Sequence, residues 1–310
     1  MEITETDTKM NRHDICCIGH ITLDKVETTR SVCHMAGGTA FYFSNALAGM
    51  DVSYTLVTAL APAEMQAVED LRAKGVEVRA LPSAHTVYFE NIYGEDSDHR
   101  TQRVLQTADA FTVSQLNDVQ ARIFHLGPLL AGDIPVDLIK TLAAKGQVSL
   151  DAQGYLRKVE NHEVLAVDWP DKREALPYIH ILKTNESEMA VLTGQPDILK
   201  GAKILADWGV REVVVTLGSL GSVIYADGNF SYIQAYIPTT SVVDATGCGD
   251  TYMAGYLYQR TKGATIQDAG EFAAAIATLK IESSGPFTGT RKDVMNLLAS
   301  RKDKVYAGIF

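Results

Sequence analysis

Residues 243–256 read VDATGCGDTYMAGY, which places two glycines directly before a stretch with the spacing of an amphipathic helix. Gly247 and Gly249 allow the backbone to turn tightly and to present successive N–H groups at the helix start. The N-terminus of a helix also carries a partial positive charge. We therefore predict that the backbone of Gly247, Cys248 and Gly249 forms an anion hole for a transferring phosphoryl group.

Asp250 follows these glycines and would lie in the first turn of the helix. A carboxylate is a poor ligand for phosphate, but it is a suitable base for removing the proton of an attacking hydroxyl. The alternative is an aspartate that only caps the helix, and this is the commoner role for an isolated G-x-G-D. The length of the DATGCGD segment favours the catalytic role for Asp250.

The composition is that of an ordinary globular protein. The chain has 310 residues, a formal net charge of −10 and a sequence pI near 5.3. An acidic chain has no general attraction for nucleic acid or anionic membranes, so we expect neither as a partner. The four cysteines lack metal-site spacing, and no apolar run suits a signal peptide or a membrane span. These features predict a cytoplasmic protein.

Strands and helices are expected to alternate along most of the chain. This pattern predicts an α/β fold, in which a mostly parallel sheet carries helices on both faces. A hairpin is expected at 222–225 and 231–236. The other expected strands are 14–19, 54–59, 76–81, 122–126, 148–152, 179–184 and 212–217. The expected helices are 39–50, 64–74, 135–145, 186–193, 197–208, 249–262, 265–283 and 291–300.

Two β-rich insertions interrupt this alternation. Residues 86–93 and 101–105 read as a hairpin around a polar turn, and the residues after the first strand read as a loop with short strands. We expect a small β lid from segments near 24–37 and 85–107. The rest of residues 14–310 would form one large domain, and residues 1–13 would be a flexible tail. Ligands of such sheets bind at the carboxyl ends of the strands.

The segment from Asp244 to Asp250, followed by Ala254 and Gly255, resembles the second signature of the PfkB/ribokinase family of carbohydrate kinases. That signature is D-T-x-G-A-G-D before a helix of small residues, so Ala245 and Cys248 are mild departures. The resemblance implies a ribokinase-like fold with a small β lid. It also implies ATP-dependent phosphorylation of a hydroxyl on a small sugar or polyol, with Asp250 as the base.

Two further motifs resemble the nucleotide-binding parts of the same family. Asn185 and Glu188 match its N-x-x-E pattern, which implies a role in ordering Mg²⁺ around the ATP phosphates. Thr216, Gly218 and Gly221 match its T-x-G-x-x-G nucleotide loop. Each motif taken alone is also compatible with an ordinary helix start or an ordinary glycine turn.

The acceptor side of the site is implied by motifs near the N-terminus. Asp24 ends a GHITLD segment whose aspartate usually binds substrate hydroxyls in this family, and Gly37 and Gly38 resemble its di-glycine hinge. Many sugar kinases place asparagine four residues after the second glycine, where this chain has Tyr42. Asn45 is the nearest asparagine and is the expected substitute. The stretch at residues 37–47 resembles more closely the family branches that act on other polyols, including inositol kinases.

Other inferences from the resemblance remain open. Asp151 and Arg157 match a D-x-x-G-x-x-R pattern, for which structural roles are favoured. Asp244 and residues 283–286 lie where relatives often bind a monovalent cation, so K⁺ is an optional cofactor. The resemblance also allows a homodimer formed through the lid. Alternative functions are a nucleoside or inositol kinase, or a sensor of a sugar or nucleotide without catalysis.

Overall fold

The computed structural model describes residues 12–27, 32–93 and 100–307. A nine-stranded sheet runs through the main domain in the order β15-β14-β13-β12-β9-β8-β1-β4-β5. All neighbouring pairs from β13 to β5 are parallel, and the pairs β13–β14 and β14–β15 are antiparallel. The strands are β1 (His13–Gly19), β4 (Tyr54–Leu60), β5 (Glu77–Pro82), β8 (Ala121–Gly127), β9 (Gln147–Asp151), β12 (Ile181–Asn185), β13 (Glu212–Thr216), β14 (Ser222–Ala226) and β15 (Asn229–Ile233).

Helices cover both faces of this sheet because its strands are apolar on both sides. Every residue of β4 is buried, as expected for a central strand of a parallel sheet. The apolar core on one face includes Phe43 and Phe272, and the core on the other face includes Leu138 and Met189. The first face carries α1 (Gly38–Leu47), α2 (Gln66–Ala73), α7 (Cys248–Thr261), α8 (Ile266–Ile281) and α9 (Arg291–Ala307). The second face carries α3 (Val136–Ala143), α4 (Lys172–Ala175), α5 (Glu186–Thr193) and α6 (Ile198–Asp207).

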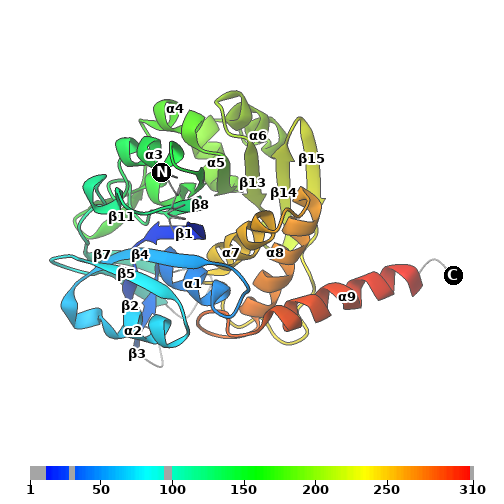
Figure 1. Cartoon of the computed structure of the whole chain (residues 1–310), viewed down its shortest axis with the longest axis horizontal. Helices are drawn as coiled ribbons and strands as arrows, with labels where there is room; N and C mark the ends of the chain where they lie inside the picture. Colours follow the sequence, from blue (N-terminus) through cyan, green and yellow to red (C-terminus); the bar gives the residue numbers. More distant parts are fainter. Residues whose placement is uncertain (1–11, 28–31, 94–99, 308–310) are drawn as a thin grey trace, which may run out of the picture.

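A second, six-stranded sheet lies beside the main domain, at the lower left in Figure 1 and away from β15. Its order is β10-β11-β7-β6-β2-β3, and only the β2–β6 pair is parallel. A small apolar cluster that includes Val87, Val104 and Leu129 packs beneath it. The strands are β2 (Thr22–Glu27), β3 (Val32–Gly37), β6 (Val87–Tyr93), β7 (Arg100–Gln106), β10 (Arg157–Glu160) and β11 (Glu163–Ala166).

The hairpin of β10 and β11 is absent from the sequence-based expectation. Its loop is Asn161-His162, and these residues have φ values of 50° and 69°. A two-residue hairpin loop favours positive φ at both positions, which Asn-Gly supplies most easily. The Asn-His loop lacks that glycine, so the sequence contains no strong signal for this turn.

The boundary of the expected flexible tail also changes slightly, because His13 already belongs to β1 and residues 1–11 lie outside the described residues. The polar turn at 94–98 lies outside them as well.

Short 3₁₀ turns connect several of these elements. They are η1 (Pro62–Glu64), η2 (Ser114–Leu116), η3 (Ala152–Leu156), η4 (Leu176–Tyr178) and η5 (Gly218–Leu220). The third directly follows β9 and the fifth follows β13, so both lie at the carboxyl ends of sheet strands. They therefore border the region where an α/β sheet binds ligands.

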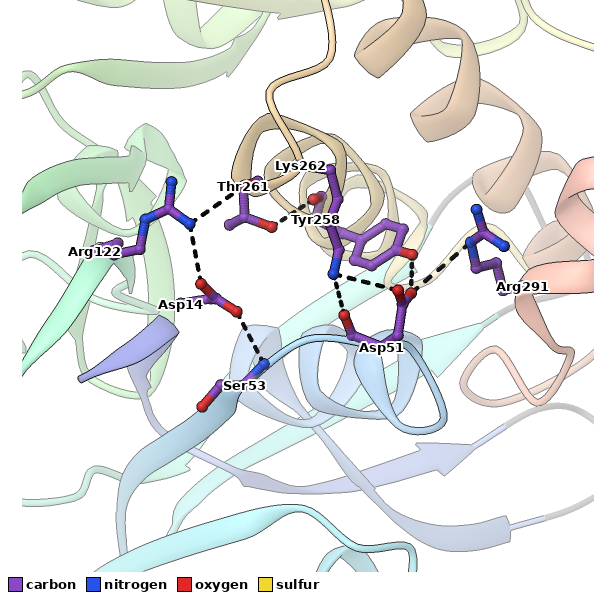
Figure 2. Close-up of polar contacts among 8 residues, drawn as sticks. All are labelled: Asp14, Asp51, Ser53, Arg122, Tyr258, Thr261, Lys262 and Arg291. Atoms are coloured by element: carbon purple, nitrogen blue, oxygen red, sulfur yellow. Dashed lines mark hydrogen bonds and ion pairs between the residues drawn. The ribbon is translucent and has the colours of Figure 1, made fainter. Parts of the chain in front are cut away.

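The C-terminal end of α7 is fixed to the loop after α1 (Figure 2). The Tyr258 hydroxyl donates a hydrogen bond to the Asp51 carboxylate, and Lys262 donates to the Asp51 carbonyl oxygen. The Lys262 Nζ also lies 3.3 Å from Asp51 Oδ2, and the Arg291 Nε lies 3.9 Å from Oδ1. Asp51 therefore joins α7 to the start of α9.

A second set of contacts joins the same end of α7 to the sheet. Arg122 Nη1 donates to Asp14 Oδ1 at 3.1 Å and to the carbonyl oxygen of Thr261 at 3.3 Å. Asp14 in turn accepts a hydrogen bond from the Ser53 backbone N–H at 3.2 Å. These contacts anchor the C-terminal end of α7. They therefore help to fix its N-terminal turn, which lies near the carboxyl ends of the strands.

Cys16, Cys17, Cys33 and Cys248 are free thiols, and the first two are buried in β1. Within residues 12–27, 32–93 and 100–307, no helix combines the length and apolar character needed to cross a membrane.

Candidate active site

The glycine corner before α7 presents unpaired backbone N–H groups. Gly247 caps the helix with φ 74°, a left-handed conformation that favours glycine, and no side chain caps the helix start. The Cys248 N–H donates to the Ala245 carbonyl oxygen at 3.2 Å. Among the described residues, the N–H groups of Gly249 and Asp250 have no hydrogen-bond partner. The corner can therefore bind an anion.

Asp250 lies in the first turn of α7 and is partly exposed to solvent. Burial of the carboxyl raises its pKa to about 6, and the nearby charge of Asp151 adds to the rise. Lys183, Thr39 and Arg157 act in the opposite direction. A carboxyl group with this pKa is mostly ionised at neutral pH, yet it accepts a proton more readily than an ordinary aspartate.

Lys183 and Asp151 form a buried ion pair under the glycine corner. They are paired across β12 and β9, with Nζ 3.0 Å from Oδ2 and side chains only 7% and 3% exposed. A Cβ placed on Gly249 would lie 3.2 Å from Lys183 Nζ, so the ammonium group contacts the corner. Burial would lower the pKa of Lys183, but the charges of Asp151, Glu188 and Asp250 raise it. The signal for Lys183 was a lysine inside an apolar strand, and sequence reasoning missed it.

Asn185 and Glu188 form a reciprocal cap at the start of α5. Asn185 Oδ1 accepts the Glu188 N–H at 2.8 Å, and Glu188 Oε2 accepts the Asn185 N–H at 2.9 Å. Burial raises the pKa of Glu188, while the Lys183 charge opposes that rise. One carboxylate oxygen of Glu188 is left outside the cap, which fits a contact to Mg²⁺ through water. In the described part of the chain, no group of three His, Cys, Asp or Glu side chains could hold a metal alone.

The expected nucleotide loop adjoins this cap. Thr216 pairs in register with Asn185 at the carboxyl ends of β13 and β12, and its hydroxyl donates to the Thr184 carbonyl oxygen at 3.4 Å. Gly218 and Gly221 have φ values of 56° and 101°. A side chain at Gly221 would also collide with the backbone that follows β15. The structure therefore brings the two expected donor-binding motifs together on neighbouring strands.

Asp24 and the two glycines form a compact group in the second sheet. The Thr22 hydroxyl donates to Asp24 Oδ1 at 2.6 Å, which orients the carboxylate. A Cβ on Gly37 would lie 2.5 Å from Asp24 Oδ2, so a side chain there would displace that oxygen. Gly38 has φ 85°, and its Cβ would lie 2.6 Å from the His20 carbonyl oxygen. The backbone path therefore requires glycine at 38, whereas glycine at 37 leaves room for the Asp24 carboxylate.

Tyr42 connects the acceptor side of the site to the glycine corner. It is 2% exposed, and its ring lies where a side chain on Gly247 would be. Burial raises the pKa of Tyr42, and the charges of Asp244, Asp24 and Asp250 add to this rise. The charges of a carboxylate on β2 and of one at the start of α7 therefore both act on this tyrosine.

The structure does not bring Asn45 into this group. Its amide nitrogen donates to the Phe41 carbonyl oxygen at 2.8 Å, and its amide oxygen accepts from Lys74 Nζ at 2.6 Å. The side chain is 3% exposed. Both ends of Asn45 are thus used to join α1 to the end of α2, and Tyr42 takes the position facing the corner.

An anion hole at a helix start with an ionisable carboxylate beside it is the arrangement expected of a phosphotransferase that acts on an alcohol. The sequence profile of the pfkB family of carbohydrate kinases matches residues 12–293. The chain belongs to this family, and it is a carbohydrate kinase. The predicted resemblance, fold class and enzyme class are all confirmed.

Individual relatives share the fold along nearly the whole chain. A pyrophosphate-dependent kinase of the ribokinase family, solved with a pyrophosphate analogue and myo-inositol, superposes with a TM-score of 0.81 at 31% identity, covering 91% of this chain and 99% of that one. A cytidine kinase from Thermococcus kodakarensis is 29% identical over 82% of this chain and 91% of its own length.

Ribokinase from Arabidopsis thaliana gives a shorter alignment. It is 36% identical over 143 residues, which are 44% of this chain and 38% of that protein. A structure of Arabidopsis ribokinase complexed with ribose and ATP superposes with a TM-score of 0.78 at 24% identity, covering 93% of this chain and 99% of that one.

Proposed function

We propose that this kinase transfers the γ-phosphate of ATP to a hydroxyl of a small sugar or polyol held between Asp24 and Asp250. The observation that carries this proposal is the glycine corner at the start of α7, where the Asp250 carboxylate adjoins N–H groups that are unpaired within the described residues and the Tyr42 ring packs against Gly247. Asp24 is held by Thr22, and Asp250 stands at a helix start with free N–H groups. A substrate hydroxyl bound beside Asp250 would therefore face both a base and an anion hole.

In this mechanism Asp24 accepts hydrogen bonds from substrate hydroxyls and orients the acceptor. Asp250 takes the proton of the attacking hydroxyl as its oxygen approaches the γ-phosphorus in line, and ADP leaves. The N–H groups of Gly249 and Asp250 bind the transferring phosphoryl oxygens. The buried Lys183 ammonium adds positive charge behind this corner and is fixed by Asp151.

The donor would lie along residues 216–221 and the corner at 247–249. Large apolar side chains are exposed on the segments that flank this path, including Leu220 (74%), Ile237 (87%) and Val243 (54%). A flat nucleobase would cover such side chains. Asn185 and Glu188 would hold Mg²⁺ through water, and when bound with the donor this ion neutralises phosphate charge. The Arabidopsis ribokinase complex with ATP supports this donor.

A second candidate is transfer from pyrophosphate to an inositol. It is favoured by the 31% identical kinase solved with a pyrophosphate analogue and myo-inositol. The replacement of the expected asparagine by Tyr42 also changes the acceptor side. A nucleoside acceptor is the next alternative, because the Thermococcus relative is a cytidine kinase. A sensor without catalysis is disfavoured by the raised pKa and position of Asp250.

A matrix of two donors and four acceptors tests these alternatives. ATP and pyrophosphate would each be incubated with ribose, fructose, myo-inositol and cytidine, and ³¹P NMR would identify the phosphorylated product. We expect one acceptor to be phosphorylated with ATP, and no product with Asp250→Asn. Product formed only from pyrophosphate would replace the proposed donor. Saturable acceptor binding without any product would favour the sensor.

We further propose that the second sheet is a lid over the acceptor and that lids pair into a homodimer. Val32 and Leu165 are large apolar residues of this sheet that are 55% and 37% exposed. Val32→Asp should then convert a dimer to a monomer in light-scattering measurements, and a wild-type monomer would reject the dimer.

We propose the cytoplasm as the location of this protein. The free thiols of Cys16 and Cys17 suit that reducing compartment.

A further inference from the structure

Lys280 is a buried cation in the last turn of α8, and the mechanism above does not use it. The residue is 0% exposed. Its Nζ donates a hydrogen bond to the carbonyl oxygen of Asp244 at 2.7 Å and lies 3.3 Å from Asp244 Oδ2. It also lies 5.7 Å from the centroid of the Tyr42 ring, within the range of a cation–π contact. A lysine is almost never fully buried unless its charge is paired, so this position has a specific role.

The partner of Lys280 is the first residue of the DATGCGD segment that forms the glycine corner. Asp244 Oδ1 accepts the Thr246 N–H at 2.9 Å, and this contact shapes the turn. The Val243 N–H donates to the Ile281 carbonyl oxygen at 2.9 Å, which ties the same segment to the end of α8. The backbone that leads into the anion hole is therefore attached to α8 next to the Lys280 ammonium.

The charge of Lys280 acts to lower the pKa values of two groups in this turn, Asp244 and Cys248. Burial would raise the pKa of Asp244, but hydrogen bonds from Thr246 and the charge of Lys280 lower it below its usual value. Burial raises the pKa of Cys248 to about 11, and the Lys280 charge works against that rise. One ammonium group thus supplies positive potential to the start of the turn and to its middle.

Asp244 and residues 283–286 are the positions at which sequence analysis allowed K⁺. A monovalent cation at this place would need the Asp244 carbonyl and carboxylate oxygens as ligands. Lys280 Nζ already contacts both of them, and a second cation beside it would be repelled. At Asp244 the residues present therefore do not fit K⁺.

We propose that the Lys280 ammonium is a built-in cation that holds the anion-binding turn, so that this kinase works without a monovalent metal ion. Lys280 is a positioning residue, since it acts through Asp244 and not on the substrate. The idea rests on the proposed function only in assigning the anion hole to this corner. The cation at Asp244 is then a lysine ammonium, and not the K⁺ that the sequence suggested.

The test replaces the side chain and offers a free cation in its place. Lys280→Ser removes the ammonium and leaves space, two Asp244 oxygens and a new hydroxyl, which together can accept K⁺ or NH₄⁺. Lys280→Met removes the charge but keeps most of the volume, so it leaves no room for an ion. Lys145→Ser is the matched control, because Lys145 Nζ also donates to two carbonyl oxygens, at 2.9 and 2.8 Å, far from the site in sequence.

Melting temperatures would be measured in KCl, NH₄Cl and tetramethylammonium chloride at equal ionic strength. We expect wild-type protein to melt alike in all three salts. We expect K280S to melt lower in tetramethylammonium and to recover several degrees in KCl or NH₄Cl, whereas K280M and the Lys145 control show no cation-specific recovery. This readout needs no substrate, so it decides the inference even if the proposed acceptor or donor is wrong.

Phosphoryl transfer gives the second readout once an acceptor is known. Wild-type turnover should change less than about twofold between tetramethylammonium and potassium, while K280S should gain about tenfold from potassium. Activation of the wild type by about tenfold in potassium would overturn the proposal. A K280S protein that folds but responds equally to all three salts would overturn it as well. If K280S does not fold, the wild-type measurements alone decide, because a cation-dependent wild type is incompatible with an internal ammonium at this position.

Discussion

Lys183 Nζ lies 3.0 Å from Asp151 Oδ2, and it would lie 3.2 Å from a Cβ placed on Gly249. The ion pair bridges two central strands, and its ammonium group lies next to the corner that we assign to the transferring phosphoryl group. The Asp250 carboxyl feels both charges, with Asp151 raising its pKa and Lys183 lowering it. The pair therefore affects both the binding of an anion at the corner and the pKa of Asp250.

Lys183→Met should reduce turnover by about 10²- to 10³-fold, because it removes a fixed charge beside the transferring group. It should also cost about 3–5 kcal/mol of unfolding free energy by leaving Asp151 buried and unpaired. Steady-state kinetics and urea denaturation measure the two effects. Adding Asp151→Asn should restore part of the stability but not the turnover, whereas recovery of turnover would show that Lys183 acts only structurally. Lys172→Met, which removes an ion pair to the exposed Asp168, is the control.

Asp250→Asn should abolish turnover and should stabilise the folded protein at neutral pH. Folding raises the Asp250 pKa from 3.8 to about 6, so the ionised carboxylate destabilises the fold above pH 6 and has no effect below about pH 4. The gain at pH 8 should be between about 1 and 3 kcal/mol, since the side chain keeps some solvent contact. Urea denaturation at pH 8 and pH 4 would measure it. An equal gain at both pH values would contradict the ionisation argument.

The wild-type pH profile should show an acid limb set by Asp250. Turnover requires the ionised base, so kcat/KM should fall as the pH decreases through about 6. Asp151→Asn removes the neighbouring negative charge and should move this limb to lower pH. A limb that stays in place in that variant would assign the titration to another group.

Gly37→Ala should weaken acceptor binding with little effect on the fold. The new Cβ would stand 2.5 Å from Asp24 Oδ2, so the carboxylate must turn away from its position beside Thr22. The backbone at Gly37 is extended, with φ −152°, so alanine brings no conformational strain of its own. We expect KM for the acceptor to rise about tenfold or more, with KM for the donor unchanged. Gly132→Ala is the matched control, because a Cβ there meets nothing within 4 Å.

The main sheet and the glycine corner could be predicted because their signals are local. Apolar runs followed by helical spacing indicate the parallel strands, and DATGCGD carries its turn and its helix start within a few residues. Contacts between distant segments gave no such signal. Lys183 and Asp151 meet only because β12 lies beside β9, and Lys280 meets Asp244 only because α8 ends beside the turn before α7.

The acceptor side shows the same limit. Spacing from Gly38 suggested Asn45 as the substitute for the missing asparagine. The amide of Asn45 is instead occupied by Phe41 and Lys74, and Tyr42 itself faces the corner. Which face of a buried helix a polar residue occupies depends on what packs against it, and a single sequence does not contain that information.

The second sheet takes its strands from three separated stretches, Thr22–Gly37, Val87–Gln106 and Arg157–Ala166. It is therefore not a cassette that can be cut out or exchanged at a single pair of junctions. A chimera that imports the acceptor preference of a relative must replace all three stretches together and rejoin the chain at six places. Because elements of the main domain separate these stretches along the chain, proteolysis should release no stable fragment that contains this sheet alone.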